Sequence, residues 1–309
     1  MTNDRLWSEL SSHMRGRVER DLPLAPLTTY RLGGAAALYV EPVDEDDLGV
    51  VATALARDPV DILMLGRGSN VVVSDAGWLG LVVRMGAAFS WVRPGERSGA
   101  ISAGASTSLP VVANWAARRG LSGLEFFVAI PGSIGGAVRM NAGAHGGATA
   151  DCLTEARLFD LATGHARVEA VADLGFDYRT SGVGPNDIVI EAAFGLQRED
   201  ERAIRDRMDA YRKHRAATQP PAVQNAGSVF KNPPGDSAGR LVEAAGLKGF
   251  SVGGASVSQL HANFFIAGPD ATAQDVFDLV RAVRERVHEA SGIDLTPEIH
   301  FAGGFDRSS

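Results

Sequence analysis

The chain has 309 residues, of which 45% are hydrophobic and 22% charged, so it holds enough apolar material for more than one globular core. Its formal net charge of −7 argues against a nucleic-acid-binding protein, which would present a basic surface. A single cysteine, Cys152, excludes an intrachain disulfide and a cysteine-rich metal site. No stretch resembles a signal peptide or a membrane span, so we expect a cytoplasmic protein that binds neither membrane nor nucleic acid.

The first half of the chain predicts short buried strands that alternate with amphipathic helices. The acidic run 44–47 suits the N-terminus of a helix that carries Leu48, Val51 and Leu55 on one face. Ser108 is a predicted N-cap of the next helix, and Gly120 fits its C-terminal stop. Uninterrupted apolar runs predict strands over residues 61–65, 71–73, 81–84 and 100–103.

The second half contains the clearest helix signals. After a predicted strand over 188–196, the charged segment 198–215 predicts a helix with Ile204, Met208 and Tyr211 on one stripe. A further helix begins near Ser237, and Thr272-Ala-Gln-Asp275 is a capping box that precedes a run of valines and leucines at helical spacing. Residues 298–301 alternate like a strand, and the mixture of elements predicts an α+β fold.

The charged helix is the expected connector between two regions. We expect residues 1–200 to form one region in two subdomains, roughly 1–75 and 76–200, and residues 201–309 to form a second, smaller domain. The last residues either belong to this domain or pack back on the first subdomain.

Two glycine-rich segments are candidates for ligand binding. Gly66-Arg-Gly-Ser-Asn70 follows a buried strand, and such a loop can present backbone N–H groups to an anion, although a plain tight turn is the alternative. The segment Gly123–Gly146 is more specific, because Pro131-Gly132 and Gly135-Gly136 are expected to turn the chain twice and leave a flat surface of small residues. A planar ring system would fit such a surface.

These two segments, with Leu27–Gly34, resemble the flavin-binding segments of the UDP-N-acetylenolpyruvoylglucosamine reductase (MurB) family. The resemblance extends from about Leu27 to Phe301 and implies an FAD-binding domain of the vanillyl-alcohol-oxidase (PCMH) type, followed by a C-terminal α+β substrate-binding domain. It implies non-covalent FAD and NADPH as co-substrate, with Gly66–Asn70 at the FAD pyrophosphate. The cofactor-binding residues that it implies are Tyr30, Arg31, Gly66, Arg67, Gly68, Ser69, Asn70, Pro131, Gly132, Ser133, Gly135, Gly136, Asn141, Gly143 and His145.

The chemistry of reducing an enolpyruvyl ether requires a hydride, a proton donor and a group that stabilises the developing negative charge. No amino acid supplies a hydride, so a flavin must. The resemblance assigns the proton to Ser228 and the stabilisation of the enol intermediate to Arg179 and Glu298. A serine hydroxyl is a poor acid in water, so its role requires a very basic carbanion and local stabilisation.

The substrate implied by the resemblance is the UDP-sugar UDP-N-acetylglucosamine enolpyruvate, and Tyr178, Lys231 and Asn232 are its candidate contacts. The basic cluster 212–215 is a second candidate for the diphosphate, with a solvated helix end as the alternative. No histidine pair has the spacing of a metal site. The interval from Arg179 to Ser228 is too short for the extra loop of one family type, which predicts the loop-deficient second type.

Two other functions remain open at this point. One is an oxidase of the same flavoprotein superfamily, and the other is a flavin-binding sensor that has lost the chemistry. The presence of Arg179, Ser228 and Glu298 together favours the reductase over both. We expect a monomer, although an oligomer is compatible with the sequence, and the preference between NADPH and NADH is left open.

Overall fold

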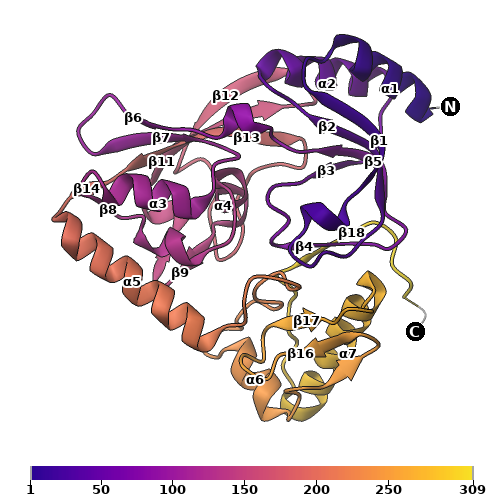
Figure 1. Cartoon of the computed structure of the whole chain (residues 1–309), viewed down its shortest axis with the longest axis vertical. Helices are drawn as coiled ribbons and strands as arrows, with labels where there is room; N and C mark the ends of the chain where they lie inside the picture. Colours follow the sequence, from indigo (N-terminus) through magenta and orange to yellow (C-terminus); the bar gives the residue numbers. More distant parts are fainter. Residues whose placement is uncertain (1, 308–309) are drawn as a thin grey trace. The chain divides into compact units, whose positions relative to one another are not determined.

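The computed structural model describes residues 2–307, with side chains from residue 3 onward. The chain divides into two compact units, each assembled from three segments. The first unit comprises residues 1–20, 38–67 and 80–215, and the second comprises residues 21–37, 68–79 and 216–309. Both units mix helices and strands (Figure 1), so the expected α+β class is confirmed.

A four-stranded sheet with the order β1-β2-β5-β3 lies mainly in the first unit, although residues 21–23, 35–37 and 78–79 of its strands belong to the second. Its strands are β1 Arg17–Pro23, β2 Ala35–Glu41, β5 Trp78–Val83 and β3 Ile62–Met64, and β3 runs parallel to β5. Helices α1 Thr2–His13 and α2 Glu45–Arg57 lie beside this sheet (Figure 1). They bury Leu6, Leu10, Leu48 and Val51 in one core with the sheet residues Leu38 and Leu81. Asp44 caps α2 by accepting the N–H of Asp47 at 3.0 Å, as the acidic run predicted.

A five-stranded antiparallel sheet forms the rest of the first unit's framework, with the order β12-β11-β13-β7-β6. Its strands are β6 Val92–Pro94, β7 Ala100–Gly104, β11 Leu153–Asp160, β12 His165–Ala170 and β13 Asp187–Gly195. Two short pairs accompany it, β8 Leu121–Ser122 with β14 Gln197–Arg198 and β9 Gly143–Ala144 with β10 Gly147–Ala148.

Three helices belong to this part of the first unit, namely α3 Leu109–Ala117, α4 Ile134–Met140 and α5 Glu201–Thr218, whose last three residues lie in the second unit. The predicted stripe of α5 holds, because Ile204 and Met208 are buried in the core and Tyr211 packs against it. Single-turn 3-10 helices occur at Ala87–Phe89, Glu125–Ala129 and Thr149–Asp151.

The second unit is built around α7 Ala273–Ser291, which buries Val276, Leu279, Val280, Val283 and Val287. The predicted capping box is confirmed, since Thr272 and Asp275 each bind the other's backbone N–H. The remaining elements are the 3-10 helix Ala25–Leu27, the helix α6 Ala238–Ala244, the antiparallel strands β15 Ser251–Val252, β16 Ala255–Val257 and β17 Phe265–Ala267, and the parallel pair β4 Val71–Val73 and β18 His300–Ala302.

Candidate functional site

A cavity of about 120 Å³ lies in the first unit where β3, α4 and the start of β13 meet. Its wall combines aliphatic side chains with glycines and three arginines. The lining residues are Met64, Leu65, Gly66, Arg67, Arg84, Met85, Ala105, Ser106, Ser133, Gly135, Gly136, Arg139, Val183, Asp187, Ile188 and Val189. Five of these, namely Gly66, Arg67, Ser133, Gly135 and Gly136, are among the cofactor-binding residues expected from the sequence.

The glycines bring main chain to the cavity surface. A Cβ atom at Gly66 would lie 3.0 Å from the Oγ of Ser133, so a larger residue there would displace the serine. Ser133 is buried and serves as the N-cap of α4. The expectation that Gly135-Gly136 turn the chain was wrong, because both residues lie inside α4; the helix presents its smallest residues to the cavity and buries Ile134, Ala137 and Val138.

The charge of the cavity wall suits an anion. Arg67, Arg84 and Arg139 belong to the lining, whereas Asp187 is its one acidic residue. FAD carries its negative charge on a diphosphate and has two flat ring systems, so a wall of aliphatic side chains, glycines and guanidinium groups fits its chemistry.

The rest of the predicted pyrophosphate loop belongs to the second unit. Gly68 has a left-handed backbone, with φ of 63°, and a Cβ atom there would lie 2.2 Å from the carbonyl oxygen of Leu27, so glycine is required. The Gly68 carbonyl accepts the backbone N–H of Thr29 at 2.9 Å. Asn70 holds the last strand in place, since its side chain donates to the carbonyl of Glu298 at 3.2 Å and its carbonyl accepts the N–H of His300 at 3.0 Å.

Ser228 and Glu298, which lie 70 positions apart in the sequence, are brought together in the second unit. The N–H of Glu298 donates to the carbonyl of Val229 at 2.7 Å, and Ser228 forms an antiparallel bridge with Phe264. The serine therefore lies on a strand-like segment between the segments that carry Phe264 and Glu298. Ser228 and Glu298 are both only partly exposed.

Two buried asparagines fix the segment that carries Ser228. Asn225 accepts the N–H of Gly227 at 3.1 Å and donates to the carbonyls of Pro221 and Val223. Asn263 binds both main-chain groups of Phe230. Neither asparagine was singled out from the sequence, although an asparagine flanked by apolar residues, as in Ala262-Asn-Phe-Phe265, is a signal for a buried polar clamp.

Arg179 lies in the first unit, where its backbone adopts the left-handed region with φ of 56°. Its guanidinium donates to the carbonyl of Gly143 at 2.8 Å and lies 5.1 Å from the centre of the Tyr178 ring. The candidate substrate contact Tyr178 is 47% exposed. A left-handed arginine is strained, and such strain is concentrated at functional positions.

Two other expected cofactor-binding residues, Asn141 and His145, contact neighbouring segments of the first unit. Asn141, with φ of 43°, donates to the carbonyl of Asp177 and accepts the N–H of Ala150, so it joins three segments. The ring of His145 stacks on Tyr211 with centroids 4.1 Å apart. Burial lowers the pKa of His145, and the nearby His214 and Arg215 lower it further.

The remaining candidates lie in the second unit, apart from Pro131 and Gly132, which precede α4 in the first unit. Tyr30 is a core residue, 1% exposed, whose hydroxyl donates to the carbonyl of Phe265 at 3.0 Å. Arg31 has φ of 57° and an exposed side chain. Lys231 donates its N–H to the carbonyl of Thr296, and the side chain of Asn232 accepts the N–H of Ala238. For all these residues the cofactor or substrate role stays a prediction.

Profiles of two protein domains match the chain. An FAD-binding domain matches residues 36–168, and the C-terminal domain of UDP-N-acetylenolpyruvoylglucosamine reductase matches residues 219–302. The first match and the cavity lined by three arginines place the chain in the class of FAD-binding proteins.

Full-length proteins that are similar to this chain show the family to which it belongs. UDP-N-acetylenolpyruvoylglucosamine reductase of Rhodopseudomonas palustris (strain BisB5) is 45% identical over 292 residues, which cover 94% of this chain and 93% of the relative, and that of Geobacter sulfurreducens is 39% identical over 97% and 99% of the two chains. The crystal structure of the Thermus caldophilus reductase (MurB) covers 93% of this chain and all of its own chain, with a TM-score of 0.81 and 37% identity. The chain therefore belongs to the UDP-N-acetylenolpyruvoylglucosamine reductase family.

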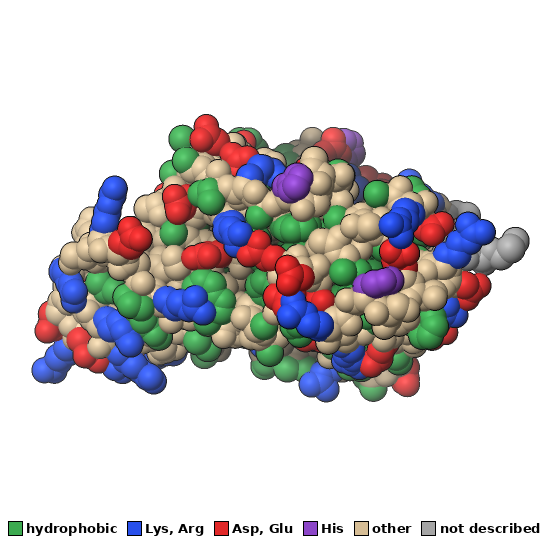
Figure 2. Space-filling model, turned by 90° about the horizontal axis from the view of Figure 1, so that it is seen from above, with side chains coloured by type: hydrophobic (Ala, Val, Ile, Leu, Met, Phe, Trp, Pro, Cys, Tyr) green, Lys and Arg blue, Asp and Glu red, His purple; other side chains and the backbone are tan. Residues whose placement is uncertain are grey.

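Further features of the described residues concern membrane-spanning helices, metal sites and surface charge. None of their helices is long and apolar enough to cross a membrane. Residues 2–307 contain no cluster of three histidine, cysteine or acidic side chains that would hold a metal ion. On the face drawn in Figure 2, basic and acidic side chains are interspersed.

Proposed function

We propose that the chain catalyses the NADPH-dependent, FAD-mediated reduction of UDP-N-acetylglucosamine enolpyruvate to UDP-N-acetylmuramate, a step of peptidoglycan precursor synthesis in the cytoplasm. The observation that carries this proposal is the adjacency of Ser228 and Glu298 in a chain of this family. A proton donor and a carboxylate held on neighbouring main chain are two of the groups that the reaction needs.

The cavity residues would hold the cofactor. Gly66, Arg67 and Ser133 would contact its diphosphate region, and Gly135 and Gly136 would let a ring approach α4 closely. When bound, FAD would supply the hydride for the terminal alkene carbon of the substrate.

The chain's own residues complete the reaction. Ser228 donates its hydroxyl proton to the carbon that bears the substrate carboxylate, as its O–H bond breaks and a C–H bond forms. The planar guanidinium of Arg179 and the carboxyl group of Glu298 stabilise the enol intermediate that precedes this proton transfer. Tyr178, Lys231 and Asn232 are the proposed contacts of the UDP-sugar.

Anaerobic mixing tests the proposal. The purified yellow protein should lose its flavin absorbance when NADPH is added, and should regain it when the enolpyruvyl substrate is added without oxygen. Recovery that needs oxygen would identify an oxidase instead, and a protein that shows neither change would be a binding protein without this activity. NADH added in place of NADPH in the first step determines the nucleotide preference.

A further inference from the structure

The cavity wall contains an arginine whose position is fixed by main chain. Arg139, near the end of α4, donates to the carbonyl of Gly184 at 2.9 Å and to that of Val183 at 3.5 Å. Its own carbonyl accepts the hydroxyl of Ser181 at 2.8 Å. The guanidinium is thus tied to the loop that precedes β13, and it keeps its place only as long as that loop does.

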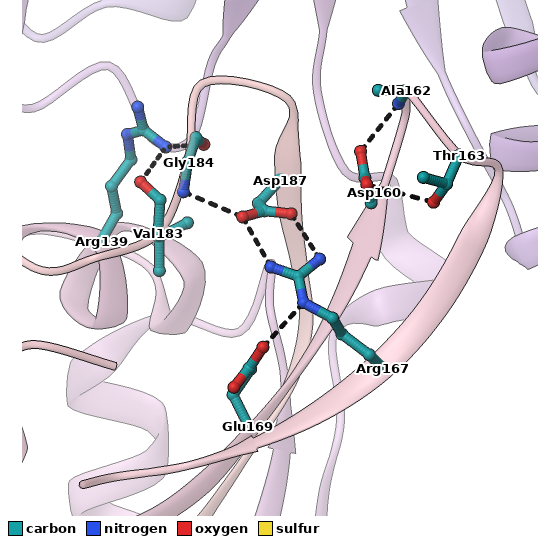
Figure 3. Close-up of polar contacts among 9 residues, drawn as sticks. All are labelled: Arg139, Asp160, Ala162, Thr163, Arg167, Glu169, Val183, Gly184 and Asp187. Atoms are coloured by element: carbon teal, nitrogen blue, oxygen red, sulfur yellow. Dashed lines mark hydrogen bonds and ion pairs between the residues drawn. The ribbon is translucent and has the colours of Figure 1, made fainter. Parts of the chain in front are cut away.

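The loop is in turn held by an ion pair (Figure 3). Asp187, which also lines the cavity, accepts the N–H of Gly184 at 2.9 Å and binds Arg167 through two parallel hydrogen bonds of 2.7 and 2.8 Å. Arg167 comes from β12 and reaches Asp187 across β11, the strand between β12 and β13. It does not line the cavity, and its Nε donates to Glu169 at 2.8 Å.

The charges along this chain of contacts are complementary. The Asp187 side chain is only 10% exposed, and the hydrogen bonds from Arg167 lower the pKa of this carboxyl below its ordinary value. The charge of Arg139 lowers the pKa of Asp187 as well, so the carboxylate interacts with both arginines. With Arg167 absent, Asp187 would be a nearly buried carboxylate without its ion-pair partner.

We propose that Arg167 and Asp187 are positioning residues for the cofactor. Their ion pair holds the Gly184 loop, the loop holds the guanidinium of Arg139 at the cavity wall, and Arg139 there faces the anionic diphosphate of FAD. This inference rests on the proposed placement of FAD in the cavity. It assigns Arg167, which does not line the cavity, an indirect role in FAD affinity.

Titration of the apoprotein with FAD tests the inference. Arg139→Gln should weaken FAD binding about 10-fold or more, because it removes a charged hydrogen-bond donor from the diphosphate. Arg167→Gln should weaken it about 3- to 10-fold, by releasing the loop. The matched control is Arg157→Gln on β11 of the same sheet, which removes an ion pair with Glu45 of α2. Neither residue lines the cavity, so FAD affinity should stay unchanged.

Two further readouts separate positioning from a general loss of stability. In a double-mutant cycle the effect of Arg167→Gln should largely disappear when Arg139 is already glutamine, because the pair acts through that guanidinium. The salt dependence of FAD affinity should also become shallower in both variants, since one positive charge near the diphosphate is lost or displaced. A merely destabilised protein would keep the slope of the wild type.

The outcomes distinguish a failure of the FAD placement from a failure of the positioning role. If Arg139→Gln binds FAD as tightly as the wild type, the cavity is not the diphosphate site and the proposed placement fails. If Arg139→Gln weakens binding while Arg167→Gln does not, or if the two effects simply add, the placement stands and the positioning role is overturned.

Discussion

The side chain of Asn263 binds both main-chain groups of Phe230, accepting its N–H at 2.9 Å and donating to its carbonyl at 2.8 Å. Because Asn263 is 3% exposed, water cannot replace either bond when the side chain is removed. Asn263→Ala should therefore lower the free energy of unfolding by about 2–4 kcal/mol, measured by urea denaturation. Asn186→Ala, at an exposed turn, should change it by less than about 0.5 kcal/mol.

Ser228→Ala tests the proposed proton donor. NADPH should still reduce the bound flavin, whereas reoxidation by the enolpyruvyl substrate should slow by about 10²-fold or more, since general acid catalysis contributes roughly that factor. Stopped-flow absorbance measures the two half-reactions separately. Ser251→Ala, on the exposed end of β15, serves as the control. Reoxidation at the normal rate in Ser228→Ala would remove this residue from the role.

Glu298→Gln tests the proposed stabilisation of the enol. The change keeps the size of the side chain and leaves the main-chain bond from Glu298 to Val229 intact, so the fold of this segment should persist. Turnover should fall by about 10²-fold while the FAD content of the purified protein stays the same. Loss of flavin together with activity would show that the residue is structural.

The carboxylate of Asp47 joins three backbone donors of the first unit. It accepts the N–H groups of Arg15, Gly16 and Val43 at 2.8 to 3.0 Å, and Asp47 is 1% exposed. Asp47→Ala would leave these donors without their acceptor, so we expect a loss of about 3 kcal/mol or more in the free energy of unfolding. Chemical denaturation checks the value, and Asp46→Ala, at the exposed neighbouring position, is the control.

The stability of the first unit should depend on pH through Glu125. Burial would raise the pKa of this carboxyl, but hydrogen bonds from Arg207 and the N–H of Gly123 outweigh it, so the pKa lies below its ordinary value of 4.5. A lowered pKa in the folded state means that the stabilisation is present above about pH 4.5 and is lost as the pH falls through the lower value. Glu125→Gln should therefore lower stability at pH 7, by about 2 kcal/mol, and this difference should vanish in acid. Unfolding curves between pH 3 and 7 provide the measurement.

The sequence predicts the local features of this fold well where a side chain acts on its own neighbours. The capping box at Thr272 and Asp275 depends on residues three positions apart, and the start of α2 depends on the acidic run 44–47; both are found as expected. The Gly135-Gly136 pair predicts a turn, because glycine is common in turns, yet α4 includes both residues. Tertiary contacts there override local propensity.

Other features could not be predicted, because they depend on pairs distant in sequence. Nothing near Asp187 in the sequence indicates that Arg167 binds it across an intervening strand, and nothing near Phe230 indicates Asn263. The resemblance to a known family supplied candidate residues at such positions. The physical reasons for their placement become visible only in three dimensions.

The discontinuous make-up of the second unit has a consequence for biosynthesis. Asp75 caps α7 by accepting the N–H groups of Ala273 and Gln274, both at 3.0 Å, and β4 pairs with β18 at the other end of the chain. On the ribosome, Asp75 and β4 emerge roughly 200 residues before these partners exist. Val72 and Tyr30 are core residues of this unit, so their apolar side chains stay without most of their packing partners until translation is almost complete. A ribosome that stalls late would therefore expose an apolar surface that chaperones bind.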